Sequence, residues 1–138
     1  MKLGVAEILK NASKLKSRND KINYLRTNKS LPLKQVLQYC FDPNIKWALP
    51  EGFPPFRSND KLVDQESMFY NEARRLYLFI EGGHPTLKQT RREQLFIELL
   101  ETLDPNDANM LCSIKDKKMP FKGITYKLTK ETFPDILP

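Results

Sequence analysis

A chain of 138 residues with 40% hydrophobic and 29% charged residues has the composition of one folded domain with a sizeable core. No apolar run approaches the length of a transmembrane helix, which excludes a membrane-spanning protein at the sequence level. The formal net charge of +6 leaves several kinds of partner open, so the distribution of the charge matters more than its sum.

The N-terminal residues and the cysteines indicate the compartment. The sequence from Met1 to Ile8 has no apolar signal-peptide segment, so we expect an intracellular, cytoplasmic protein. Cys40 and Cys112 form no Cys-x-x-Cys pair, and isolated cysteines in such a chain are expected to be reduced thiols in the core.

The first 41 residues predict three helices. The first carries one apolar stripe at helical spacing, Ser17 or Asn19 caps a short second helix, and Pro32 suits the first turn of the third, which Asp42-Pro43 ends. The three expected inward faces are Val5, Ile8, Leu9, Ala12 and Leu15; Ile22 and Leu25; and Leu33, Val36, Leu37, Cys40 and Phe41.

A loop of about residues 42–64 follows. Residues 44–49 have room for one helical turn around Trp47, whereas the run from Leu49 to Phe56 holds three prolines and cannot be helical. We expect its aromatic rings to pack down onto the protein, because a flexible linker would be more polar. The alternative is an exposed apolar segment that binds a partner.

Four further helices are predicted. One runs from about Gln65 to Ile80 and is stopped by Gly82-Gly83-His84-Pro85; the next is capped by Thr86; Asp104-Pro105 starts another; and Thr125 caps the last. The expected inward residues are Met68, Phe69, Ala73, Leu76, Tyr77 and Ile80; Leu95, Phe96, Leu99, Leu100 and Leu103; Ala108, Leu111 and Ile114; and Leu128 and Phe133. We therefore predict an all-α, single-domain bundle of six or seven helices over residues 1–138.

The positive charge lies in two separate parts of the chain. Residues 1–40 carry nine Lys/Arg against two acids, a net charge of +7, and residues 113–130 carry six lysines against one acid, a net charge of +5. Residues 41–85 carry five against seven, a net charge of −2. A fold that joins the two basic parts would make a basic face, which is typical of nucleic-acid binding. A generally lysine-rich surface without a partner is the alternative.

The residues that catalysis or metal binding would need are missing. His84, the single histidine, lies in a glycine-proline turn, so we expect no metal, no cofactor and no histidine-dependent nucleophile. Gly82-Gly83 is not followed by the Lys-Ser/Thr of a phosphate loop, and Glu98 with Glu101 is typical of a solvated helix face. The sequence predicts a protein that is not an enzyme.

Two parts of the chain carry short motifs in a shared order. Ala12-Ser13, Lys21-Ile22 and the run from Leu33 to Tyr39 lie within the first, Ile8 to about Trp47; Lys118, Gly123 and the closing run from Phe133 to Pro138 lie within the second, about Leu99 to Pro138. In this order the chain resembles the N-terminal DNA-binding domain of phage-type ATP-dependent DNA ligases, while residues 50–95 match only loosely. Pro120-Phe121-Lys122 departs from the family pattern before the glycine.

The resemblance implies a helical domain that lies on the minor groove of duplex DNA and grips its backbone around a nick. The Lys-x-Asp-Gly motif of ligase adenylation is not present, so ligase activity is not implied. The expectation is a monomeric, non-catalytic, sequence-tolerant binder of duplex DNA, nicked DNA included, in the host-cell cytoplasm if a phage encodes it. The expected DNA-binding residues are Lys14, Lys16, Arg18, Lys21, Lys117, Lys118, Lys122, Gly123, Thr125, Lys127 and Lys130.

Two other roles stay open. A protein-interaction module could use Trp47, Phe53 and Phe56 to bind a host or phage replication or transcription factor. A minor structural protein of a virion is the third possibility.

Overall fold

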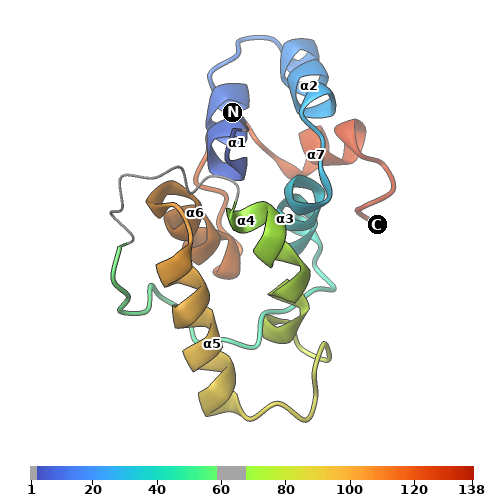
Figure 1. Ribbon diagram of the computed structural model, residues 1–138. Helices are drawn as coiled ribbons and strands as arrows, with labels where there is room; N and C mark the ends of the chain where they lie inside the picture. The colour runs from blue at the N-terminus through green and yellow to red at the C-terminus, as the bar shows by residue number, and fades with distance from the viewer. Residues whose placement is uncertain (1–2, 59–67) are drawn as a thin grey trace.

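The structure, a computed structural model, describes residues 3–58 and 68–138 (Figure 1). Over these ranges the chain is all-helical, which confirms the predicted fold class, and residues 59–64 of the predicted loop lie outside them. The described elements are α1 (Val5–Ser13), α2 (Arg18–Thr27), α3 (Leu31–Phe41), α4 (Met68–Glu72), the 3-10 helix η1 (Ala73–Phe79), α5 (Gln89–Thr102), α6 (Pro105–Lys115) and α7 (Tyr126–Thr132).

Short polar side chains start three of these helices where the sequence predicts. The hydroxyl of Ser17 accepts a hydrogen bond from the Asp20 amide at the start of α2, and Thr125 accepts one from the Leu128 amide at the start of α7. The Asp104 carboxylate caps α6 in the same way, directly before Pro105. Each cap satisfies an amide that has no partner within its own helix.

One cluster of buried apolar side chains joins α1, α2, α3, α5, α6 and α7 with α4 and η1. Helices α3 and α6 pack on each other, and α1 packs on both α2 and α6. The largest fully buried side chains are Phe69, Phe79, Phe96, Leu9, Leu25, Leu33, Leu37, Leu76, Leu100, Leu103, Leu111 and Ile114.

The helix predicted from Gln65 to Ile80 is wrong in its second half. Residues 65–67 lie outside the described part, α4 ends at Glu72, and η1 continues as a 3-10 helix. With three residues per turn, Ala73, Leu76 and Phe79 align on one face and are buried. Tyr77, predicted to point inward, is 47% exposed.

The helical turn predicted around Trp47 is also wrong, because that segment is extended. Trp47 forms an isolated antiparallel bridge with Ile80, which leaves the amide of Ala48 donating to the carbonyl oxygen of Phe79 over 2.7 Å. The Trp47 indole nitrogen donates to the Tyr39 carbonyl over 3.2 Å, and the two rings meet edge to face. Trp47 therefore ties α3 to the end of η1.

Helix α5 begins at Gln89, three residues after the predicted cap Thr86, and its N-cap is Lys88. The reason is the buried guanidinium of Arg92, which donates to the carbonyl oxygens of Leu78 and His84 over 2.9 and 3.0 Å. These bonds hold the His84 carbonyl against the first turn of α5, which favours a turn before Lys88.

None of the helices within residues 3–58 and 68–138 is both long enough and apolar enough to cross a bilayer.

Candidate nucleic-acid interface

The two basic parts of the chain meet through the packing of α2 on α7. The guanidinium of Arg26 donates to the carbonyl oxygens of Thr132 and Glu131 over 3.2 and 3.0 Å. At the other end of α2, Arg18 pairs with the Glu131 carboxylate over 2.6 Å. In Figure 1 α2 and α7 lie at the same end of the molecule, although more than 100 residues separate them.

Gly123 also lies at the contact between the two parts. It has a φ of +86°, in the left-handed region that a side chain rarely adopts. A Cβ atom at Gly123 would lie 3.2 Å from Cε of Lys21, so the lysine stem lies across the glycine. The Lys21 amino group then donates to the Leu15 carbonyl over 2.7 Å. The structure therefore brings Lys21 and the turn at Lys122-Gly123 together.

A second contact region places Lys14 beside the same loop. A cavity of about 680 Å³ is lined by Lys10 and Lys14 of α1 and by Pro120 and Phe121 of the loop before Gly123. Lys14 thus lies on the same part of the surface as the loop that carries Lys118 and Lys122.

Five predicted lysines are exposed and have amino groups without hydrogen bonds or ion pairs in the described part of the chain. These lysines are therefore available to phosphate groups. They are Lys14, Lys16, Lys118, Lys122 and Lys127. We call these five residues with Lys21 the basic surface.

Three other predicted residues are held by the protein itself, as the Lys21 amino group is held by the Leu15 carbonyl. The amino group of Lys117 donates to the carbonyl oxygens of Tyr39 and Asp42 over 2.9 and 2.7 Å, at the end of α3. Lys130 donates to the carbonyls of Pro134 and Leu137 over 3.1 and 2.7 Å. Arg18 has its carboxylate partner in α7. Cations at helix ends commonly bind carbonyl oxygens in this way. The sequence therefore predicted more lysines and arginines available to DNA than the structure leaves unbound.

The surroundings of Lys117 also change its acidity. Its backbone has a φ of +61°, the one positive φ among the described non-glycine residues, and its amino group contacts the end of α3. Burial lowers the pKa of Lys117, while the Cys40 thiol and the Asp42 carboxylate act in the opposite direction. These features describe a structural lysine.

The predicted helix-start contact at Gly123 to Thr125 is partly occupied. The Thr125 hydroxyl already accepts the Leu128 amide over 3.2 Å, so it serves as a helix cap. Its role toward DNA stays a prediction, as does that of Gly123.

Lys10 was missed by the sequence analysis. It is exposed and lies four residues before Lys14, on the same side of α1, and both line the 680 Å³ cavity. The helical spacing of Lys10 and Lys14 was the signal that identifies it.

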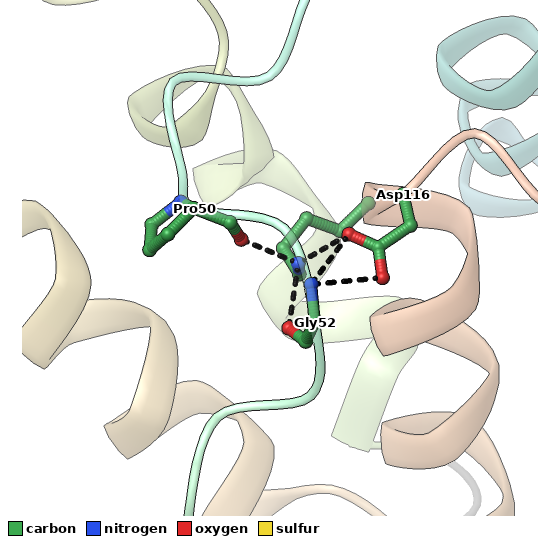
Figure 2. A network of polar contacts seen from close by, with 4 residues as sticks. Pro50, Gly52 and Asp116 are labelled. Atoms are coloured by element: carbon green, nitrogen blue, oxygen red, sulfur yellow. Dashed lines mark hydrogen bonds and ion pairs between the residues drawn. The ribbon is translucent and has the colours of Figure 1, made fainter.

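The aromatic loop is fixed by a buried lysine. The Lys115 amino group donates to the carbonyl oxygens of Pro50 and Gly52 over 2.8 and 2.9 Å and pairs with the Asp116 carboxylate over 2.6 Å. The same carboxylate accepts the Gly52 amide, as Figure 2 shows. Sequence reasoning assigned Lys115 no role, because burial of a lysine cannot be inferred from its spacing.

This network presents one ring of the loop and leaves the others packed. Phe53 is 57% exposed, whereas Phe56 and Trp47 pack partly against the core. The expected packing of the run from Leu49 to Phe56 is therefore correct for Phe56 and wrong for Phe53, which is the ring that a partner can reach.

The described residues contain no group of three or more histidine, cysteine, aspartate or glutamate side chains that could hold a metal. Cys40 and Cys112 are free and buried, as predicted, and burial raises the pKa of each thiol to about 11. A thiol with such a pKa is a poor nucleophile at neutral pH.

Residues 8–120 match the model of a family of unknown function, DUF6433. No curated protein matches the chain, and no solved structure does.

Proposed function

We propose that this chain, which belongs to the DUF6433 family, is a non-catalytic protein that binds the backbone of duplex DNA with little sequence preference. The observation that carries the proposal is the meeting of Lys21 and Gly123, which brings the basic N-terminal and C-terminal parts of the chain together. Duplex DNA, nicked DNA included, is the form of DNA expected from the resemblance to the ligase DNA-binding domain.

The chemistry of the basic surface supports backbone binding. Its charged groups are lysine amines, which act on phosphate as point charges and carry no base information. A reader of base sequence would instead present arginine, asparagine or glutamine side chains on a helix that enters the major groove. Phosphate neutralisation releases counterions, so the affinity depends strongly on salt.

Fluorescence anisotropy with a labelled duplex over a range of salt tests the proposal. The affinity of the natural chain should fall steeply between about 50 and 200 mM salt. Lys16→Ala combined with Lys122→Ala should reduce the slope of log affinity against log salt by roughly two, about one for each lost phosphate contact.

The matched control is Lys46→Ala combined with Lys88→Ala, which removes two exposed lysines outside the basic surface. Lys88 precedes α5 at the end of the molecule opposite α2 in Figure 1. This variant should bind as the natural chain does. An affinity that ignores salt, or no binding at about 50 mM salt, would contradict the proposal.

A second candidate function is favoured by the exposure of Phe53. A ring that is 57% exposed on a loop held by Lys115 and Asp116 is preorganised for contact with another protein. A protein partner of this kind would stay bound in high salt and be lost on Phe53→Ala. DNA binding through lysines gives the opposite result on both counts.

A further inference from the structure

The 680 Å³ cavity is a groove between α1 and α6. Ala6, Lys10 and Lys14 lie four residues apart along α1, and Asn106, Asn109 and Ser113 recur at three and four residues along α6, so each helix presents one face to it. Phe53 and Phe121 complete the walls from two different loops. The volume is within the range of about 300–1,000 Å³ in which proteins hold small ligands.

The lining combines three kinds of chemistry. Phe53, Phe121 and Met110 supply apolar and aromatic surface, Asn106 and Asn109 supply amide donors and acceptors, and the rim carries lysine amines. A nucleotide needs all three: a ring surface for its base, paired donors and acceptors for the base edge, and cations for its phosphate.

Other occupants use only part of this set. An aliphatic peptide side chain would form no hydrogen bonds with the amides of Asn106 and Asn109. An inorganic anion would make no apolar contact with the rings of Phe53 and Phe121. Glu7 is the single acid among the lining residues, so the amines of Lys10 and Lys14 outnumber it.

We propose that the groove between α1 and α6 takes one unpaired nucleotide of DNA, with its base between the walls that carry Phe53 and Phe121 and its phosphate at Lys10 and Lys14. The inference rests on the proposed function, because Lys14 belongs to both the groove and the basic surface. A paired base is stacked inside the duplex and cannot enter, whereas an unpaired one at a nick or bulge reaches the groove while the flanking backbone stays on the lysines.

The test compares two labelled duplexes that differ by one extra, unpaired thymidine in one strand. The natural chain should bind the bulged duplex about tenfold more tightly, a gain typical of one base stacked on aromatic side chains. Phe53→Ala and Asn109→Ala should each lose most of this gain and keep the affinity for the paired duplex. Both residues are exposed, so these variants should fold, which circular dichroism checks.

The matched control is Tyr77→Ala, which removes another exposed ring that does not line the groove and should keep the full gain. Equal affinities of the natural chain for the two duplexes would overturn the inference. So would occupation of the groove by free thymidine monophosphate without any gain for bulged DNA, because the ligand would then be a free nucleotide.

The failure of the proposed function looks different. It would appear as no salt-dependent binding to the paired duplex and no effect of Lys16→Ala combined with Lys122→Ala. Binding of a single-stranded oligonucleotide that Phe53→Ala abolishes would still support the groove in that case.

Discussion

Lys115 has 2% of its side chain exposed and is surrounded by oxygen atoms. A buried ammonium group is costly unless every proton has a partner, and here two carbonyls and one carboxylate provide them. The lysine thereby joins the end of α6 to a loop more than 60 residues earlier.

Lys115→Met keeps the apolar stem of the side chain and removes its charge and its three hydrogen bonds. It should lower the free energy of unfolding by about 3 kcal/mol, because the Asp116 carboxylate is left buried without its cation. Urea denaturation measures the change. Lys118→Met, at an exposed lysine whose amino group has no hydrogen bond or ion pair in the described residues, should stay within about 0.5 kcal/mol of the natural chain. Equal losses in the two variants would contradict the structural role of Lys115.

Cys112 makes stability depend on alkaline pH. Burial raises the pKa of its thiol from 9.0 to about 11, with Lys115 lowering it and Asp116 raising it further. The contribution is complete below pH 9 and is lost as the pH rises toward 11, because the unfolded chain releases a proton that the folded chain retains.

Cys112→Ala should therefore lessen the fall in unfolding free energy between pH 9 and about 11, while the buried Cys40 thiol keeps its own contribution. Urea midpoints over this range measure the slope. Ile114→Val also removes buried atoms but no thiol, and it should keep the slope of the natural chain. An unchanged slope in Cys112→Ala would show that the thiol ionises alike in both states.

The helices were predictable from the sequence where local signals fix them. Ser17, Pro32, Asp104-Pro105 and Thr125 set helix starts through hydrogen bonds to neighbouring amides or through a fixed φ, and neither depends on the rest of the fold. One exception is η1, whose 3-10 turn is joined to the extended segment at Trp47 by the Trp47–Ile80 bridge. That pairing spans more than 30 residues, and periodicity within a window cannot detect it.

Substitutions at Leu76 and Tyr77 distinguish the 3-10 helix η1 from the α-helix that the sequence predicts. Leu76→Ala should lower the free energy of unfolding by about 2–5 kcal/mol, because Leu76 is fully buried. Tyr77→Ala should cost much less, since the ring is 47% exposed. Thermal or urea denaturation measures both changes. A larger loss of unfolding free energy in Tyr77→Ala than in Leu76→Ala would contradict the 3-10 helix and favour the predicted α-helix.

The candidate site was predictable in part, for a similar reason. The two basic parts of the chain are visible as local charge, and the exposed lysines Lys14, Lys16 and Lys122 follow from it. Which lysines bind carbonyl oxygens depends on distant backbone, as Lys117 with α3 shows. The groove depends on α1, α6 and two loops at once, so no single stretch of sequence indicates it.

Across the molecule as a whole, α2 and α7 close the bundle with few polar contacts. Arg26→Gln removes the guanidinium that donates to the carbonyls of Glu131 and Thr132 and should lower the free energy of unfolding by about 1 kcal/mol. It should also weaken binding to duplex DNA at low salt, because it loosens the packing that brings Lys21 to Gly123.

Arg74→Gln is the matched control, since Arg74 is exposed and its side chain has no hydrogen bond or ion pair within the described part of the chain. It should change neither the urea midpoint nor the anisotropy titration. Equal effects at Arg26 and Arg74 would mean that lost charge, and not the closure of α2 on α7, explains the result.

The dependence of the lysine arrangement on both ends of the chain has a consequence for heating. A protein whose cations all lie on one short tail can still bind DNA after the rest of the chain unfolds. Here the lysines lie together only while residues about a hundred positions apart in the sequence stay in contact. Recognition and folding are therefore one cooperative unit, and on warming the capacity to hold DNA should vanish within the melting transition, not ahead of it.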